Sequence, residues 1–454
     1  MEALLLLLAL LLGGAVTSAV PVEGSSALVI CVGVALFMGV FIARAKEHRR
    51  FLLRLFVGAL LARMLIGSII YILQLENFFG GDAYTYDGLG YGLLQLLEGH
   101  KSYKYLLEGA LSTSGGNGWG MAYLVAGIYK LVGRNMLATQ YVNSVLGATT
   151  APVVFLCAQH IFNNPRVSRL AGIAVAFYPS LVLWSAQGLK DGPIVFTLCL
   201  SILAILSLGN KFSFRYLVLL LFSLFALLSL RFYVFYMMVA AVGGAFVIGM
   251  RPVTAQSFVR QFAVMIFLGL GLTYFGVSRS ANAQLEKYGN LEAVQISRSD
   301  MAHRDTKSGF GKDVDVSTTS GALSALPTGV TYLLLAPFPW QLTSLRQSIT
   351  FPEMALWWLS FPLLILGLWF TVQYRLRQAS PILIFTSMLT LAYSLFQGNV
   401  GTAYRQRSQL LVFYFIFVAV GFVLLKEQLE NRKRQTDAAK RTDIANARRS
   451  PETT

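Results

Sequence analysis

Long apolar runs alternate with short polar breaks along almost the whole chain. A helix of about 20 apolar residues crosses the roughly 30 Å hydrocarbon layer of a membrane, and helices satisfy their own backbone groups in lipid. The pattern therefore predicts an all-α, polytopic transmembrane bundle of about twelve spans. These spans are expected at residues 4–20, 27–43, 53–75, 136–160, 170–186, 192–208, 216–230, 232–250, 262–277, 354–372, 382–396 and 410–425.

Composition supports a single membrane domain over residues 1–425. Of the 454 residues, 56% are hydrophobic and only 13% are charged, more apolar surface than a soluble domain can bury. The net charge of +16 comes from Lys and Arg in short connections between apolar runs. That placement is typical of cytoplasmic loops, so we do not expect a nucleic-acid partner. The basic tail, residues 426–454, is expected to be cytoplasmic and disordered.

The basic connections set the predicted orientation. With all of them inside, both termini are cytoplasmic and four segments lie outside: 76–135, 187–191, 278–353 and 397–409. Residues 1–20 are interpreted as a retained span rather than a cleaved signal, because no basic residue precedes the apolar run. Within the outer segments we expect an interfacial helix over 121–132, a mobile polar stretch over 282–321 and a re-entrant or surface-lying piece over 330–340.

The first outer segment carries a carboxylate directly after two glycines, in the run Gly80-Gly81-Asp82. Glycine lets the backbone approach a ligand, and a partly desolvated carboxylate can act as a general base or hold a divalent cation. Asp82 is therefore the candidate catalytic residue. The alternative is a helix N-cap. Tyr84 and Asp87 are candidate supporting residues, although Asp87 also fits a solvated carboxylate.

Two further outer segments hold charges next to apolar spans. Lys190 and Asp191 form a tight turn, where they either serve the site or cap a helix and snorkel to the interface. Arg405 and Arg407 stand outside against the positive-inside rule, so we expect them to grip a phosphate, with lipid head groups as the alternative ligand. Donor-phosphate or lipid contact is expected of Arg231 too, and a supporting role of Asn399 and Tyr404.

The order of these features resembles the GT-C class of polyprenyl-phosphate-dependent membrane glycosyltransferases, in particular the dolichyl-phosphate-mannose protein mannosyltransferase-like members. The resemblance covers roughly residues 50–205. It rests on the Gly-Asp82 loop, Tyr129-Lys130-Leu131-Val132-Gly133-Arg134-Asn135, Gln140-Tyr141-Val142-Asn143, Ala158-Gln159-His160-Ile161-Phe162-Asn163, Phe177-Tyr178-Pro179 and the 187–191 turn.

The resemblance implies sugar transfer, hexosyltransferase-like, from a polyprenyl-phosphate donor to a glycan, lipid or protein acceptor at the extracytoplasmic face. Asp82 would be the base, Lys190 or Asp191 its partner, and Arg405 with Arg407 the phosphate ligands. The family often has two adjacent acidic residues in the first loop, whereas this chain has one, so a divalent cation (Mg²⁺ or Mn²⁺, on Asp82) stays open.

Two other functions fit the pattern less well. An O-antigen or polysaccharide polymerase or ligase also combines many spans with outer arginines, and would make Arg405 and Arg407 essential but Asp82 dispensable. A transporter or flippase needs charges along a path between the two faces, whereas here they gather on one side. By analogy with polyprenyl-linked chemistry, the expected location is a bacterial inner membrane.

Overall fold

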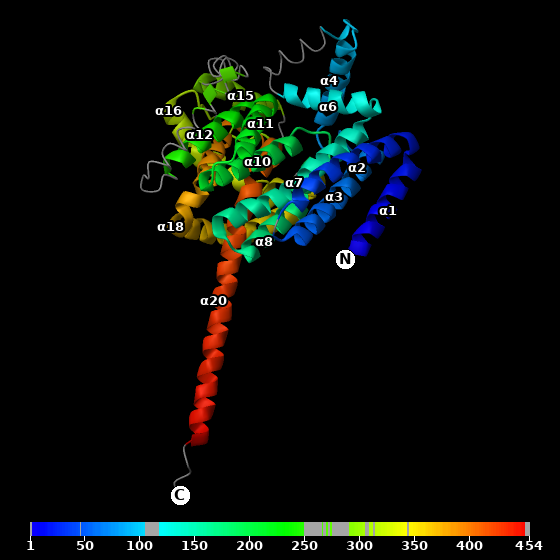
Figure 1. Cartoon of the computed structure of the whole chain (residues 1–454). Helices are drawn as coiled ribbons and strands as arrows, with labels where there is room; N and C mark the ends of the chain where they lie inside the picture. The colour runs from blue at the N-terminus through cyan, green and yellow to red at the C-terminus, as the bar shows by residue number, and fades with distance from the viewer. Residues whose placement is uncertain are drawn as a thin grey trace.

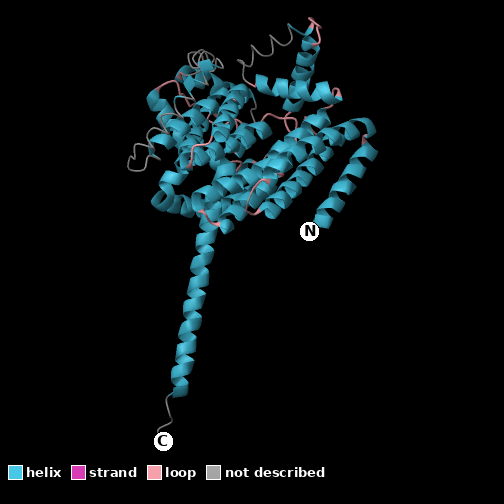
Figure 2. Cartoon of the chain, viewed as in Figure 1, coloured by secondary structure: helices cyan, strands magenta, loops and turns pink. Residues whose placement is uncertain are grey.

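The computed structural model describes residues 2–45, 47–104, 118–248, 290–304, 308–311, 314–342 and 345–449, with the isolated positions 266, 269–270 and 273–274. Helices dominate this part of the chain (Figure 2). Its only extended pairing is a single antiparallel bridge between Gly309 and Asn399. The all-α prediction is confirmed.

Among the described residues, seven helices are long and apolar enough to cross a membrane, or up to eight if a bent pair counts as one span. The seven are α1 (Glu2–Ala19), α2 (Pro21–Ala43), α3 (Arg49–Ile72), α7 (Met136–Phe162), α10 (Asp191–Asn210), α18 (Phe351–Phe396) and α20 (Ser408–Arg449). The pair is α8 (Pro165–Phe177) and α9 (Pro179–Ser185), bent by 54°. Tyr178 is extended between them, because the residue before a proline is pushed out of the helical region.

Twelve spans are not confirmed, for three reasons. The helix α18 merges the two expected spans 354–372 and 382–396, and its backbone is non-helical only at Arg375, where it kinks. The helices α11 (Phe214–Leu230) and α12 (Phe232–Ile248) have 17 residues each and are short for a span. Most of the expected span 262–277 lies outside the described residues.

The helix α7 lies at the centre of the molecule and is buried along nearly its whole length. It packs against α2, α3, α8 and α10 (Figure 1). Small residues allow the close packing: a Cβ on Gly147 would lie 2.4 Å from the Cβ of Ser185 in α9. Such contacts are typical of membrane helices, which associate through tight van der Waals packing.

The outer segments contain further helices: α4 (Asp82–Leu97), α6 (Trp119–Val132), α15 (Leu291–Arg304), α16 (Thr319–Leu335), α17 (Leu345–Ser348) and α19 (Val400–Gln406), with a 3₁₀ turn at Pro339–Gln341. In Figure 1, α4 and α6 lie at the top of the view, and the free end of α20 projects to the bottom.

Two regions of the chain differ from the sequence-based expectation, and the piece expected to be re-entrant or surface-lying takes a defined form. Residues 291–304 form a helix inside the stretch expected to be mobile, and Arg298 ties it to the carbonyls of Ser394, Leu395 and Gln397. The expected re-entrant piece is the end of α16 followed by the 3₁₀ turn. The tail continues α20 to Arg449 instead of being irregular, because it is rich in strong helix formers and has no Gly or Pro before Pro451.

Candidate active site

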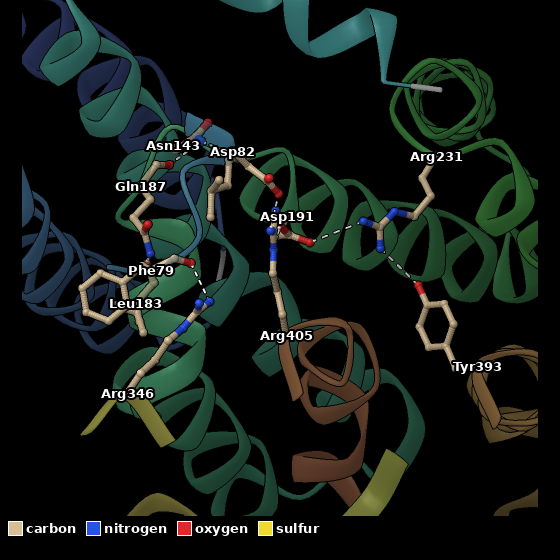
Figure 3. A network of polar contacts seen from close by, with 11 residues as sticks. Phe79, Asp82, Asn143, Leu183, Gln187, Asp191, Arg231, Arg346, Tyr393 and Arg405 are labelled. Carbon is tan, nitrogen blue, oxygen red and sulfur yellow. Dashed lines mark hydrogen bonds and ion pairs between the residues drawn. The ribbon is translucent and has the colours of Figure 1, made fainter. Parts of the chain in front are cut away.

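One guanidinium joins the three segments that the sequence singled out. Arg405, on α19, lies between two carboxylates: its Nη1 is 2.5 Å from Oδ2 of Asp82, and its Nη2 is 2.5 Å from Oδ2 of Asp191. The Nε of Arg405 also donates to Oδ2 of Asp191 at 2.7 Å. Figure 3 shows the side chains converging from separate helices. The structure thus brings the first loop and the 187–191 turn together through Arg405.

The first loop is shaped by glycine and by a buried acid. Gly80 and Gly81 have φ of 125° and 71°, values that L side chains rarely adopt, so they turn the chain sharply into α4 at Asp82. Glu76 is buried; it accepts from Gln140 of α7 and from Tyr84, both at 3.2 Å. Asp82 itself keeps 51% of its side chain exposed, so it faces solvent from a fixed loop.

The second loop is held from below by α7. Asn143 donates to the carbonyls of Gln187 and Leu189, both at 2.7 Å (Figure 3). The helix α3 comes equally close, because a Cβ on Gly67 would lie 2.8 Å from the carbonyl oxygen of Ala186. These contacts fix the turn that delivers Lys190 and Asp191 to the site.

Asp191 is the buried anchor of the cluster, with only 1% of its side chain exposed. Its second oxygen, Oδ1, faces Nη2 of Arg231 at 3.7 Å. Arg231 in turn donates to the hydroxyl of Tyr393 at 3.3 Å. A buried carboxylate is tolerated only when paired and hydrogen-bonded. Two arginines meet that need, and with Asp82 included the two arginines and two aspartates of the cluster carry no net charge.

Lys190 adds a titratable cation beside the cluster. Its Nζ lies 5.9 Å from the ring centre of Tyr86, and a Cβ on Gly118 would lie 3.3 Å from it. Burial, assisted by the positive charge of Arg231 and opposed by Asp191, lowers the pKa of Lys190 to about 7. Lys190 therefore changes charge near neutral pH.

An apolar groove of about 760 Å³ leads away from the charged cluster. Asp82 and Arg405 lie at its polar end. Its walls come from α3, from α8 and α9, from α17 and the start of α18, and from α19. The apolar lining includes Ala62, Leu65, Ile66, Ile69, Phe177, Val182 and Leu183. We call this the outer groove.

Arg407 is not part of the cluster, although only one residue separates it from Arg405. Its Nε donates to the carbonyl of Leu333 at 2.7 Å, Nη2 donates to the carbonyl of Ala336, and Nη1 contacts the sulfur of Met354. With 1% exposure, this side chain stabilises the C-terminal end of α16. The structure therefore does not place both arginines at one phosphate-binding position, as the sequence suggested. Residues two positions apart on a helix face different directions.

The supporting candidates on α4 have structural partners. Asp87 accepts from Arg134 and from the hydroxyl of Tyr129, both at 2.5 Å, so it ties α4 to the end of α6. Tyr84 donates to Glu76 and thereby braces the first loop. Neither side chain reaches Arg405 through a described contact.

The supporting candidates near α19 shape its two ends. Asn399 caps the helix by accepting from the backbone N–H of Gly401, and donates to the hydroxyl of Ser308. The hydroxyl of Tyr404 donates to the buried Glu353 at 2.7 Å. Both candidates line the outer groove, so they position Arg405 from either side along the chain.

Sequence analysis missed four residues around the site: Glu76, Asn143, Arg346 and Tyr86. Arg346 donates to the carbonyl of Phe79 at 2.9 Å and lines the outer groove (Figure 3). Asn143 carried a usable signal, because a polar amide inside an apolar span is costly unless it is bonded. The other three lie in the segments 76–135 and 278–353, which are rich in polar residues and give no such contrast.

The donor set for a metal is limited. In the described part of the chain, no group of three or more His, Cys, Asp and Glu side chains is close enough to hold a metal ion. The positive charge between Asp82 and Asp191 belongs to Arg405. A divalent cation on these aspartates would therefore compete with that guanidinium.

The fold and site define a polytopic membrane protein with a buried charged cluster beside an apolar groove. The sequence profile of the dolichyl-phosphate-mannose-protein mannosyltransferase family matches residues 118–275. This match confirms the resemblance to the GT-C class over the part that carries the second loop and Arg231, and it indicates a membrane glycosyltransferase. No curated protein sequence matches the chain.

Solved structures that align with this chain include oligosaccharyltransferases of Archaeoglobus fulgidus. The apo form aligns with 12% identity and a TM-score of 0.47, over 87% of this chain and 53% of that one. The AglB complex with an inhibitory peptide and a dolichol-phosphate aligns with 13% identity and a TM-score of 0.42, over 71% and 44%. This chain thus spans about half of the length of those proteins.

Proposed function

We propose that this protein transfers a sugar from a polyprenyl-phosphate donor to an acceptor hydroxyl at the extracytoplasmic face of the membrane. The observation that carries the proposal is the cluster of Asp82, Arg405 and Asp191 at the polar end of the outer groove. An apolar groove that ends in a guanidinium fits a lipid tail joined to a phosphate. The family match over residues 118–275 supports the same chemistry.

The two aspartates take different roles in this mechanism. Asp82 is half exposed and reaches the acceptor, whereas Asp191 is buried and orients Arg405. Asp82 removes the proton from the acceptor hydroxyl, whose oxygen attacks the anomeric carbon. The bond from that carbon to the phosphate oxygen breaks, and polyprenyl phosphate leaves with the electron pair.

The cations stabilise the leaving group. Arg405, fixed by Asp191, offers charge-assisted donors where phosphate charge develops, and Lys190 adds an ammonium beside it. Such a preorganised array stabilises the transition state more than the donor. When the donor binds, its phosphate replaces the carboxylate of Asp82 on Arg405 and frees Asp82 to act as base.

Two observations favour this reaction over the alternatives. A polymerase or ligase that depends on Arg405 and Arg407 together needs both guanidiniums at one phosphate, but Arg407 is bonded to the end of α16. A transporter needs charges along its path, yet the buried Arg63 of α3 is bonded to Ser185 and to the carbonyls of Ala59 and Ala176.

The test is sugar transfer from a panel of radiolabelled polyprenyl-phosphate sugars by the purified full-length protein. We expect Asp82→Asn and Arg405→Ala each to lower kcat/KM at least about 100-fold. Glu98→Gln, a carboxyl-to-amide change at the far end of the same helix α4, serves as the matched control and should keep wild-type activity. Repeating the assay with EDTA decides whether a divalent cation takes part.

Two results would redirect the proposal. Full activity in Asp82→Asn with no activity in Arg405→Ala would favour a polymerase or ligase that does not need an acid in the first loop. No consumption of any donor by the wild type, with donor moving between leaflets of a vesicle instead, would favour transport.

A further inference from the structure

A second groove, with about 1020 Å³ of space, opens at the opposite end of α3 from Asp82. We call it the inner groove. It lies between α1, α3 and α8, on the side of the basic connections that the sequence predicts to be cytoplasmic. Its lining is Leu5, His48, Arg49, Arg50, Phe51, Arg54, Leu55, Gly58, Arg169, Ile173 and Phe177. Nothing in the proposed sugar transfer uses this groove.

Its walls change from charged to apolar along each helix. On α3, lining residues recur at every fourth position, from Arg50 and Arg54 to Gly58. On α8, the same spacing gives Arg169, Ile173 and Phe177. Both helices start at their basic end, and positions four apart share one helix face. Eight residues of helix cover roughly 12 Å, so each stripe passes from its charged end to its apolar end over about that distance.

The cations at the mouth exceed their anionic partners. No acidic side chain lines the inner groove in the described part of the chain, and Arg54 pairs with Glu2 of α1 at 2.7 Å. That pair is exposed on both sides, so it is weak and exchangeable. The guanidinium of Arg169 lies over the ring of Phe51 at 5.4 Å, which fixes its direction at the groove.

The apolar part is open and shaped by a glycine. Ile173 and Phe177 are 42% and 49% exposed. Apolar side chains with this exposure are stable in a membrane when an apolar molecule, such as a lipid chain, covers them. A Cβ on Gly58 would meet the ring of Phe177 at 3.4 Å, so a larger residue there would narrow the slot. The missing side chain at Gly58 keeps room for a chain-like ligand.

We propose that the inner groove is a binding site for an anionic phospholipid of the cytoplasmic leaflet. Its phosphate contacts Arg49, Arg50 and Arg169, and an acyl chain lies along Ile173 and Phe177. Basic pockets between membrane helices on the cytoplasmic side are the usual receptors for anionic head groups. A zwitterionic phospholipid carries no net negative charge and matches this excess of cations less well.

The experiment measures lipid binding, so it does not depend on sugar transfer. The purified full-length protein in detergent receives increasing amounts of phosphatidylglycerol or phosphatidylcholine, and retained lipid is counted by native mass spectrometry while Tm is recorded. The test variant is Arg49→Gln/Arg50→Gln/Arg169→Gln. The matched control removes three basic residues from other connections of the same predicted side, Lys211→Gln/Arg375→Gln/Arg377→Gln.

We expect the wild type and the control to retain phosphatidylglycerol and to gain Tm with it, and the test variant to bind it at least tenfold more weakly. Ile173→Asp, which keeps every arginine but adds an anion to the wall, should weaken binding too. This second variant keeps the test decisive if the triple variant fails to fold.

Three outcomes would overturn the proposal. The first is that the test variant and Ile173→Asp bind phosphatidylglycerol as tightly as the wild type. Equal weakening in the control variant is another, because it would assign the effect to general surface charge. The third is tighter binding of polyprenyl phosphate than of phosphatidylglycerol, which would make the occupant a carrier lipid.

Discussion

The outer and inner grooves both combine apolar walls with arginine side chains, but they differ in the burial and pairing of those arginines. Each has apolar walls from α3 and α8 and an arginine-bearing end, and Phe177 lines both. In the outer groove, Arg405 has only 16% of its side chain exposed and contacts two carboxylates. In the inner groove, Arg49, Arg50 and Arg169 are exposed.

This difference in burial and pairing implies two roles for arginine: a buried, paired guanidinium has a fixed position, whereas an exposed one attracts anions without a fixed direction. Exposed cations gain little from pairing and attract any anion, with a strength that salt reduces. A buried cation must be paired, and its partners fix its direction before a ligand arrives. Asp191 therefore makes Arg405 fit to stabilise a reacting phosphate, whereas the inner arginines are fit only to hold one.

The largest expected effect comes from removing the buried partner. Asp191→Asn leaves Arg405 and Arg231 without their shared anion, so we expect the free energy of unfolding to fall by about 3 kcal/mol and kcat to fall at least about 100-fold. Asp82→Asn, half exposed, should change stability by less than about 1 kcal/mol while it abolishes transfer. Thermal unfolding in detergent and the transfer assay measure the two effects.

Equal stability of the two variants would contradict the distinction between a positioning and a reacting aspartate. The charge-retaining variant Asp191→Glu serves as the control. It should recover stability better than activity, because the longer side chain keeps the pairing but moves Arg405.

The next effect concerns the two arginines of one sequence run. Arg407→Gln leaves the carbonyls at the end of α16 without their donor, which should lower stability by about 1–3 kcal/mol. The donor KM should stay at the wild-type value, because Arg407 does not reach the outer groove. Arg405→Gln should raise the donor KM and also lower Tm, because it leaves the buried Asp191 with Arg231 alone. A raised KM in Arg407→Gln as well would return it to the phosphate site.

A pH effect of about tenfold is expected from Lys190. Its pKa of about 7 lies below the ordinary 10.5, so the ammonium is present below pH 7 and lost as pH rises through 7. Donor KM should then rise about tenfold, about 1.4 kcal/mol, between pH 6 and 8.5. Lys190→Arg should remove the rise, and a rise that persists in this variant would assign the titration elsewhere.

The pH effect on folding has the opposite sign. Between pH 7 and 10.5 the unfolded chain binds the proton that the folded Lys190 has lost, so this group adds stability as pH rises. Weaker donor binding above pH 7 is therefore distinguishable from unfolding by recording Tm in the same buffers.

Sequence patterns predicted the features that depend directly on the membrane environment. Apolar length predicted the helices, and positive charge against the orientation rule pointed to Arg405. Two other motifs, the glycines before Asp82 and the charged turn at Asp191, indicated the two carboxylates that contact Arg405. Their contact could not be deduced, because it depends on how α3, α7 and α10 pack.

Other features required the structure, because the local sequence pattern does not give the direction of a side chain or the packing of distant helices. Arg405 and Arg407 look equivalent in the sequence, yet helix α19 turns them to different sides. The inner groove arises from two stripes, on α3 and α8, that are more than 100 residues apart in the chain. The kink at Arg375 and the helical tail reflect local backbone and propensity, and the tail's high charge concealed its helix-forming composition.

The smallest effect tests whether the two grooves adjoin at Phe177. Removing this half-exposed ring deletes apolar contact worth about 1 kcal/mol, so Phe177→Ala should weaken both long-tailed donor and phosphatidylglycerol about fivefold. Leu65→Ala should affect only the donor, and Ile173→Ala only the phospholipid, because each lines one groove. If Phe177→Ala changed donor affinity alone, the inner groove would end before this ring, and its ligand would be held by head-group charge without an acyl slot.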